Sequence, residues 1–121
     1  MKLNHMNLVV PNVTETANFF EKYFDFKCPK IKNEIIAILY GEDDFVLVIS
    51  NFPKTATFNY PADFHIGFYQ EGRQQVIDTL NRLKTDGIAL NQEPSKIRDR
   101  FGFYFYAPGK ILIEITCPVE E

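Results

Sequence analysis

The sequence lacks features that mark several large classes of protein. It holds no tryptophan, two histidines and two cysteines among its 121 residues. The cysteines, Cys28 and Cys117, are too far apart for a CxxC metal or redox motif and too few for a disulfide framework. We therefore expect free thiols in a reducing cytoplasm, with one long-range disulfide as the alternative.

The sequence also lacks excess positive charge and long apolar runs. Thirteen basic and sixteen acidic side chains give a formal net charge of -3, so no global positive field attracts nucleic acid or an anionic membrane. No segment approaches the roughly 20 apolar residues of a membrane-spanning helix. Polar Asn4, His5 and Asn7 interrupt the apolar run that a secretory signal needs. We expect no nucleic-acid partner, no membrane partner and a cytoplasmic location.

Apolar surface, in contrast, is plentiful. Hydrophobic residues make up 45% of the chain and include twelve phenylalanines and six tyrosines. This composition excludes the low-hydrophobicity class of disordered chains. Because 121 residues match the size of one domain, we expect residues 1–121 to fold as a single domain.

An order of strand, helix and three strands occurs twice along the chain. The first half predicts a strand, a helix that begins with a capping box of Asn12 and Glu15, and three further strands. The four strands are expected over 3–10, 27–32, 34–40 and 45–50. After a proline-containing connector over 52–60, the order repeats with strand 63–70, helix 73–85 and strands 88–92, 100–106 and 110–117.

Neither half is large enough to cover the hydrophobic faces of its own helix and sheet. We therefore expect an α+β fold of two βαβββ modules, approximately residues 1–51 and 61–121. Their antiparallel and mixed sheets should curl into a cup with the helices outside, and such a concavity is a common place for a ligand pocket. A ferredoxin-like fold is the competing architecture, but it supplies only four strands.

Successive side chains of a strand point to opposite faces, and this alternation separates polar from apolar residues here. In three predicted strands the row opposite the apolar row contains His5, His65 or Glu114. Two imidazoles and one carboxylate bind divalent first-row metals such as Mn, Fe, Ni, Co or Zn and leave coordination positions open for a substrate. Taken singly, each residue is more often a packing or surface residue. The joint case is stronger because the two histidines lie one repeat apart and the chain has no others.

Three segments carry a resemblance to a known family. They read LNHMNLVV (3–10), FHIGF (64–68) and FYFYAPGKILIEI (103–115), and a helix with FFEKYF (19–24) follows the first. In this order and spacing they resemble the vicinal oxygen chelate superfamily, which includes glyoxalases, bleomycin-resistance proteins and extradiol dioxygenases. The resemblance implies paired βαβββ modules, a homodimer, and a small-molecule substrate or ligand.

The resemblance also implies metal ligands from the first and last strand of each module. Carried over, they are His5, His65 and Glu114, while the fourth position falls on Val48, which cannot ligate a metal. This departure argues against a four-ligand glyoxalase I site and leaves a set similar to that of extradiol dioxygenases and fosfomycin-modifying thiol transferases. Lyase, isomerase, dioxygenase and thiol-transferase chemistry all stay open.

The resemblance implies an enzyme whose metal binds vicinal oxygens of the substrate and acts as a Lewis acid. Tyr104 and Tyr69 are candidates for hydrogen bonding or proton transfer, with aromatic packing as the alternative. Asn7, Arg98 and Arg100 are candidates for substrate binding, although charged side chains of this kind often belong to a solvated loop. The alternative function is a metal-free ligand-sequestering protein of the bleomycin-resistance type.

Overall fold

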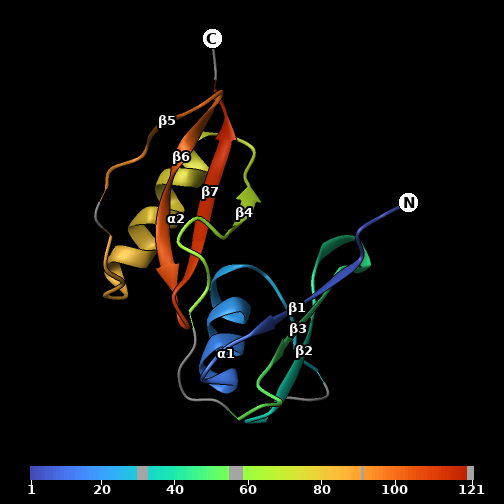
Figure 1. Cartoon of the computed structure of the whole chain (residues 1–121). Coiled ribbons are helices and arrows are strands. Elements are labelled where there is room, and N and C mark those ends of the chain that lie inside the picture. The colour runs from blue at the N-terminus through green and yellow to red at the C-terminus, as the bar shows by residue number, and fades with distance from the viewer. Residues whose placement is uncertain (30–32, 55–58, 91, 120–121) are drawn as a thin grey trace. The chain divides into compact units, whose positions relative to one another are not determined.

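The structure, a computed structural model, describes residues 1–29, 33–54, 59–90 and 92–119. The chain divides into two compact units, Met1–Asn59 (unit 1) and Tyr60–Glu121 (unit 2). Each unit holds one α-helix and one sheet, so the α+β class predicted from the sequence is confirmed (Figure 1). None of the helices in the described ranges is long and apolar enough to cross a membrane.

Unit 1 packs one helix on a three-stranded sheet. Its elements are β1 (His5–Val9), α1 (Val13–Tyr23), β2 (Ile36–Tyr40), a short 3-10 helix η1 (Glu42–Asp44) and β3 (Val46–Ser50). The strand order is β1-β3-β2, with β1 parallel and β2 antiparallel to β3. Asn12 caps α1 as predicted, since its side chain accepts a hydrogen bond from the Glu15 amide at 3.0 Å. Phe20 of α1 and Leu8 and Ile49 of the sheet are fully buried.

Unit 2 repeats this plan with one more strand. Its elements are β4 (His65–Tyr69), α2 (Arg73–Thr85), β5 (Ser95–Ile97), β6 (Arg100–Ala107) and β7 (Ile111–Pro118). The order is β4-β7-β6-β5, and only the β4–β7 pair is parallel. Helix α2 contacts β6 and β7 and ends before Gly87, whose φ of +84° suits glycine. The predicted turn at Pro108 and Gly109 joins β6 to β7.

Two predicted strands differ from the structure. Over 27–32, Lys27 forms only an isolated bridge with Tyr40, and residues 30–32 lie outside the described ranges. Next to this bridge, the Cys28 amide donates to the Glu21 carboxylate. The strand predicted over 88–92 is wrong at its described positions, because the Ile88 amide is used by the helix end, where it donates to Leu83.

The second strand of unit 2, β5, comes later in the chain than predicted. A two-residue turn, Arg98–Asp99, pairs Ile97 with Arg100, so the hairpin begins at β5 rather than at residue 88. Both cysteines are free, with Cys117 buried in β7, in agreement with the expectation from the sequence.

Candidate metal and substrate site

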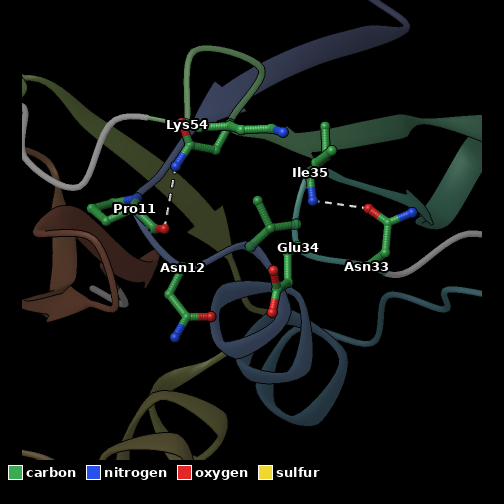
Figure 2. Close-up of a pocket in the computed structure, with 8 residues that line it drawn as sticks. Pro11, Asn12, Asn33, Glu34, Ile35 and Lys54 are labelled. Atoms are coloured by element: carbon green, nitrogen blue, oxygen red, sulfur yellow. Dashed lines mark hydrogen bonds between the residues drawn. The ribbon is translucent and has the colours of Figure 1, made fainter.

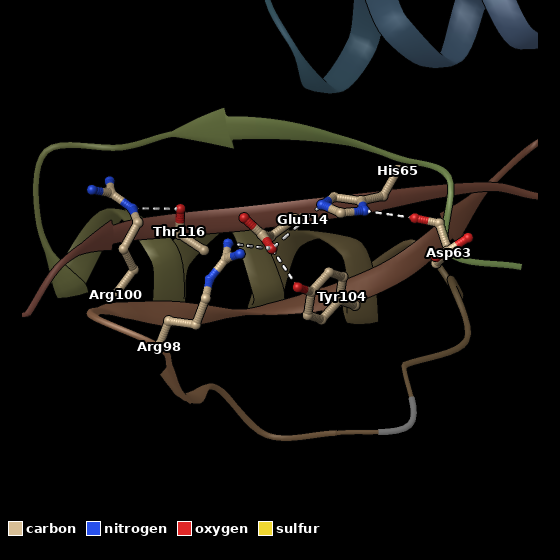
Figure 3. A network of polar contacts seen from close by, with 7 residues as sticks. All are labelled: Asp63, His65, Arg98, Arg100, Tyr104, Glu114 and Thr116. Atoms are coloured by element: carbon tan, nitrogen blue, oxygen red, sulfur yellow. Dashed lines mark hydrogen bonds and ion pairs between the residues drawn. The ribbon is translucent and has the colours of Figure 1, made fainter.

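The parallel pairing of β4 with β7 brings the predicted ligands of unit 2 together. Their register places Gly67 beside Glu114 and His65 beside Leu112. Because strand faces alternate, His65 and Glu114 share the sheet face opposite the one whose apolar row includes Ile113. Figure 3 shows their side chains pointing toward one another.

Glu114 is a buried carboxylate, with 5% of its surface exposed. Gly67 lies beside it on β4, and a Cβ there would be in ordinary van der Waals contact with Oε1 of Glu114, at 3.6 Å. A buried carboxylate is costly without hydrogen-bond donors or positive charge nearby, so its partners define the site.

Tyr104 is the direct hydrogen-bond partner of that carboxylate. It lies opposite Glu114 in the β6–β7 register, and its hydroxyl donates to Oε2. The hydrogen bond to Glu114, then burial, then the negative charge of Glu114 raise the pKa of Tyr104, while the positive charge of Arg98 lowers it. The phenol therefore keeps its proton at neutral pH and acts as a donor.

His65 presents one ring nitrogen to Glu114. Its Nε2 lies 3.9 Å from Oε2 of the carboxylate, and its ring meets Tyr104 edge-on with centroids 5.9 Å apart. On the other side, Nδ1 lies 2.9 Å from the backbone oxygen of Asp63. A carbonyl oxygen can only accept, so Nδ1 carries a proton, and in the neutral form of this tautomer the Nε2 lone pair can bind a ligand.

The two candidate arginines lie differently. Arg98 belongs to the β5–β6 turn, where its φ is +54°, and its Nη2 is 3.9 Å from Oε2 of Glu114. Because 74% of the Arg98 side chain is exposed, this ion pair is weak. Arg100 instead donates from Nε to Oγ1 of Thr116 at 2.9 Å, with its guanidinium 3.8 Å from the centroid of the Tyr69 ring. Tyr69 therefore supports Arg100.

Unit 1 carries the corresponding histidine. His5 begins β1 as His65 begins β4, and its Nδ1 lies 2.7 Å from Oδ1 of Asn4, which again leaves Nε2 as the free lone pair. Asn7 of the same row accepts a hydrogen bond from the Ser50 hydroxyl at 2.9 Å. The β1–β3 register pairs Asn7 with Val48. Val48 thus occupies the position that Glu114 has in unit 2, as inferred from the sequence.

No group of three or more His, Cys, Asp or Glu side chains that could hold a metal occurs among the described residues. The arrangement that the structure gives directly is the His65–Glu114 pair of unit 2. His5, the third predicted ligand, belongs to unit 1 and is described within that unit.

A separate surface hollow of about 740 Å³ lies in unit 1, at the start of α1 (Figure 2). Asn12, Glu34 and Lys54 are among its lining residues, and none of the predicted ligands is. The sequence offered no signal for it, because its lining comes from three separate segments with no shared periodicity.

Comparison with known proteins identifies the family of the chain. The sequence profile of the Glyoxalase/Bleomycin resistance protein/Dioxygenase superfamily matches residues 2–115. The chain belongs to this superfamily. A solved structure described as a possible glyoxalase from Bacillus cereus is 34% identical, with a TM-score of 0.84 over 97% of this chain and 99% of that one. Members of the superfamily commonly use divalent metals, bind small molecules and often dimerise.

Other relatives of this superfamily member are more distant. A probable trivalent organoarsenical cleaving enzyme of Bacillus subtilis is 26% identical over 95 residues, 77% of this chain, and the match spans 62% of that relative's length. The fosfomycin resistance protein FosX of Listeria monocytogenes is 18% identical, with a TM-score of 0.78 over 98% of this chain and 94% of the other. The latter likeness shows the shared fold.

Proposed function

We propose that this superfamily member is a metal-dependent enzyme in which His5, His65 and Glu114 hold a divalent metal, Mn, Fe, Ni, Co or Zn. The observation that carries the proposal is the His65–Glu114 pair, with the Nε2 lone pair facing the carboxylate at 3.9 Å. Two ligands at roughly 2.0–2.2 Å from one metal are separated by up to about 4.3 Å, so the pair fits a common ion.

The surroundings of the two imidazoles support the same proposal. Metal-binding histidines usually donate their second N–H to a carbonyl or carboxylate, which fixes the tautomer and the ring orientation. His65 does so toward Asp63 and His5 toward Asn4. Neutral imidazole and carboxylate are a donor set that suits first-row divalent metals.

A metal held there would supply Lewis acidity toward vicinal oxygens of a small-molecule substrate. The residues of the chain contribute orientation and proton control. Tyr104 keeps its proton and can donate it toward a substrate oxygen beside Glu114. Asn7 and Arg98, which lie on or next to the rows that carry the ligands, remain candidates for substrate contacts. Tyr69 acts through Arg100 rather than at Glu114.

We further propose that the enzyme is a homodimer that works in the cytoplasm, where its two free thiols stay reduced. Light scattering of the purified protein tests the dimer. The reaction is a lyase, isomerase, dioxygenase or thiol-transferase step. The names of the relatives described above provide the first substrates to assay on metal-loaded protein, namely fosfomycin and trivalent organoarsenicals.

Metal titration of the purified protein tests the ligand set. We expect one metal per chain, with affinity lowered roughly a hundredfold or more by His65→Ala and by Glu114→Ala, because each removes a ligand. Glu93→Ala is the matched control, since Glu93 is exposed and pairs with Lys84 at 3.1 Å. If the wild type binds no metal, the enzyme proposal fails and a metal-free ligand-sequestering role replaces it.

A further inference from the structure

Arg100 is held in place by two independent contacts. Its Nε donates to the Thr116 hydroxyl at 2.9 Å, and the flat face of its guanidinium lies 3.8 Å from the centroid of the Tyr69 ring. The two contacts involve only Nε and one face of the Arg100 guanidinium group. An arginine fixed in this way loses little side-chain entropy when it binds a further partner.

The two terminal nitrogens of Arg100 stay available. In Figure 3 they point away from Thr116, and within the described part of unit 2 no carboxylate pairs with them. Arg98 differs, since it already faces the Glu114 carboxylate at 3.9 Å. Among the described residues of unit 2, Arg100 is thus an oriented positive charge without a negative partner.

The position of Arg100 relates it to the proposed metal ligands. Thr116, its anchor, follows Glu114 by two residues on the same face of β7, a separation of about 7 Å along the strand. On the neighbouring strand β4, Gly67 and Tyr69 lie beside these two residues. A small molecule lying along β7 could reach both the His65–Glu114 pair and the guanidinium.

We propose that Arg100 binds an oxyanion, a carboxylate, phosphate or phosphonate group, and that the substrate is a small acid. The planar guanidinium with two free terminal nitrogens matches the bidentate geometry of such groups. The anion site itself rests on Arg100, Tyr69 and Thr116. The proposal that the substrate is a small acid rests on the proposed metal function as well. It puts the acidic group near Arg100 and Thr116, and the metal-binding oxygens near Glu114, two residues away on β7.

Nuclear magnetic resonance of the arginine side chains tests the anion site in metal-free protein. The chain has four arginines, Arg73, Arg82, Arg98 and Arg100, so their Nε–Hε signals can be assigned by substitution. Inorganic phosphate, methylphosphonate and acetate are the probes. We expect a saturable shift of the Arg100 signal with at least one of them, and an affinity reduced at least about tenfold in Arg100→Gln, because a charge-assisted bidentate contact is lost.

Arg73→Gln is the matched control. Arg73 also stacks on an aromatic ring of unit 2, with its guanidinium 4.2 Å from the centroid of Phe101, and its replacement changes the net charge equally. We expect it to leave the affinity within about twofold of the wild type, as expected for an exposed charge outside the contact. Thr116→Val and Tyr69→Leu keep the charge of Arg100 but remove the contacts that hold it in place. Each should therefore lower the affinity for the anion several-fold.

Three results would overturn the proposal: a shift that never saturates, equal losses in Arg73→Gln and Arg100→Gln, or unchanged binding in Arg100→Gln. Backbone amide spectra of each variant confirm its fold. Zinc titration of Arg100→Gln separates the two proposals. If Arg100→Gln still binds zinc but no longer binds the anion, the anion site is supported. If the wild type binds the anion but takes up no metal, the anion site is still supported and the metal-dependent enzyme function is contradicted.

Discussion

Replacing Tyr104 with phenylalanine removes one hydroxyl and leaves the ring. That hydroxyl donates the hydrogen bond to the Glu114 carboxylate, which is 5% exposed. The other side chains that face the carboxylate, His65 and Arg98, lie at 3.9 Å, beyond hydrogen-bond distance. A hydrogen bond to a charged group contributes about 1.5–3 kcal/mol, so Tyr104→Phe should lower the free energy of unfolding by that amount at pH 7.

The pH dependence of this effect follows from the raised pKa of Tyr104. A group whose pKa is higher in the folded than in the unfolded protein stabilises the fold fully below its unfolded pKa, and the contribution is lost as the pH rises through the folded pKa. The stability difference between wild type and Tyr104→Phe should therefore be constant near neutral pH. It should shrink above about pH 10, the pKa of a free tyrosine.

Urea unfolding followed by circular dichroism measures both effects. Tyr106→Phe is the control, because Tyr106 is the next tyrosine of the same strand and is 57% exposed, and its change should stay within about 0.5 kcal/mol. A double-mutant cycle with Glu114→Gln should give a coupling energy of about 1–2 kcal/mol. A Tyr104→Phe variant as stable as the wild type, with no coupling, would show that the Tyr104 hydroxyl does not stabilise the Glu114 carboxylate.

Other substitutions test particular positions of the fold and of the site. Gly102→Ala should destabilise the protein by about 3 kcal/mol in urea unfolding, because a Cβ there would overlap the backbone oxygen of Ile115. Gly67→Ala is the control: its Cβ would be in ordinary contact with Glu114, so it should cost less than about 1 kcal/mol. Asn12→Ala should cost about 1 kcal/mol in the same assay through loss of the α1 cap, and an unchanged stability would contradict that role. Val48→Glu restores a carboxylate at the fourth family position, so calorimetry should find tighter zinc binding, by about tenfold, if the proposed site is correct.

Strand periodicity predicted the faces of the site well. The alternation in β1, β4 and β7 placed His5, His65 and Glu114 opposite the apolar rows, as the structure has them for each strand. In β1 and β4 the apolar row is the more buried face, which fixes the side to which every residue points, whereas in β7 both rows are largely buried. Glycine and proline positions gave the turns for the same local reason.

Side-chain contacts between strands were harder to predict. The Tyr104–Glu114 pair had a signal, because counting back from the turn at Pro108 and Gly109 pairs the two residues. The Arg100–Tyr69 stack had none, since it joins strands 31 residues apart through the orientation of a long side chain. The strand expected at 88–92 failed because the end of α2 uses the Ile88 amide, which hydrophobic patterning does not report.

The most direct test of the metal proposal is to observe the histidine nitrogens during a zinc titration. The chain has two histidines, so nitrogen-15 spectra of the rings contain two sets of signals. We expect one zinc per chain to shift the Nε2 signals of His65 and His5, while Nδ1 of each ring keeps its proton, hydrogen-bonded to the Asp63 backbone oxygen or to Oδ1 of Asn4. Unchanged Nε2 signals at saturating zinc, or zinc bound through Nδ1, would contradict it.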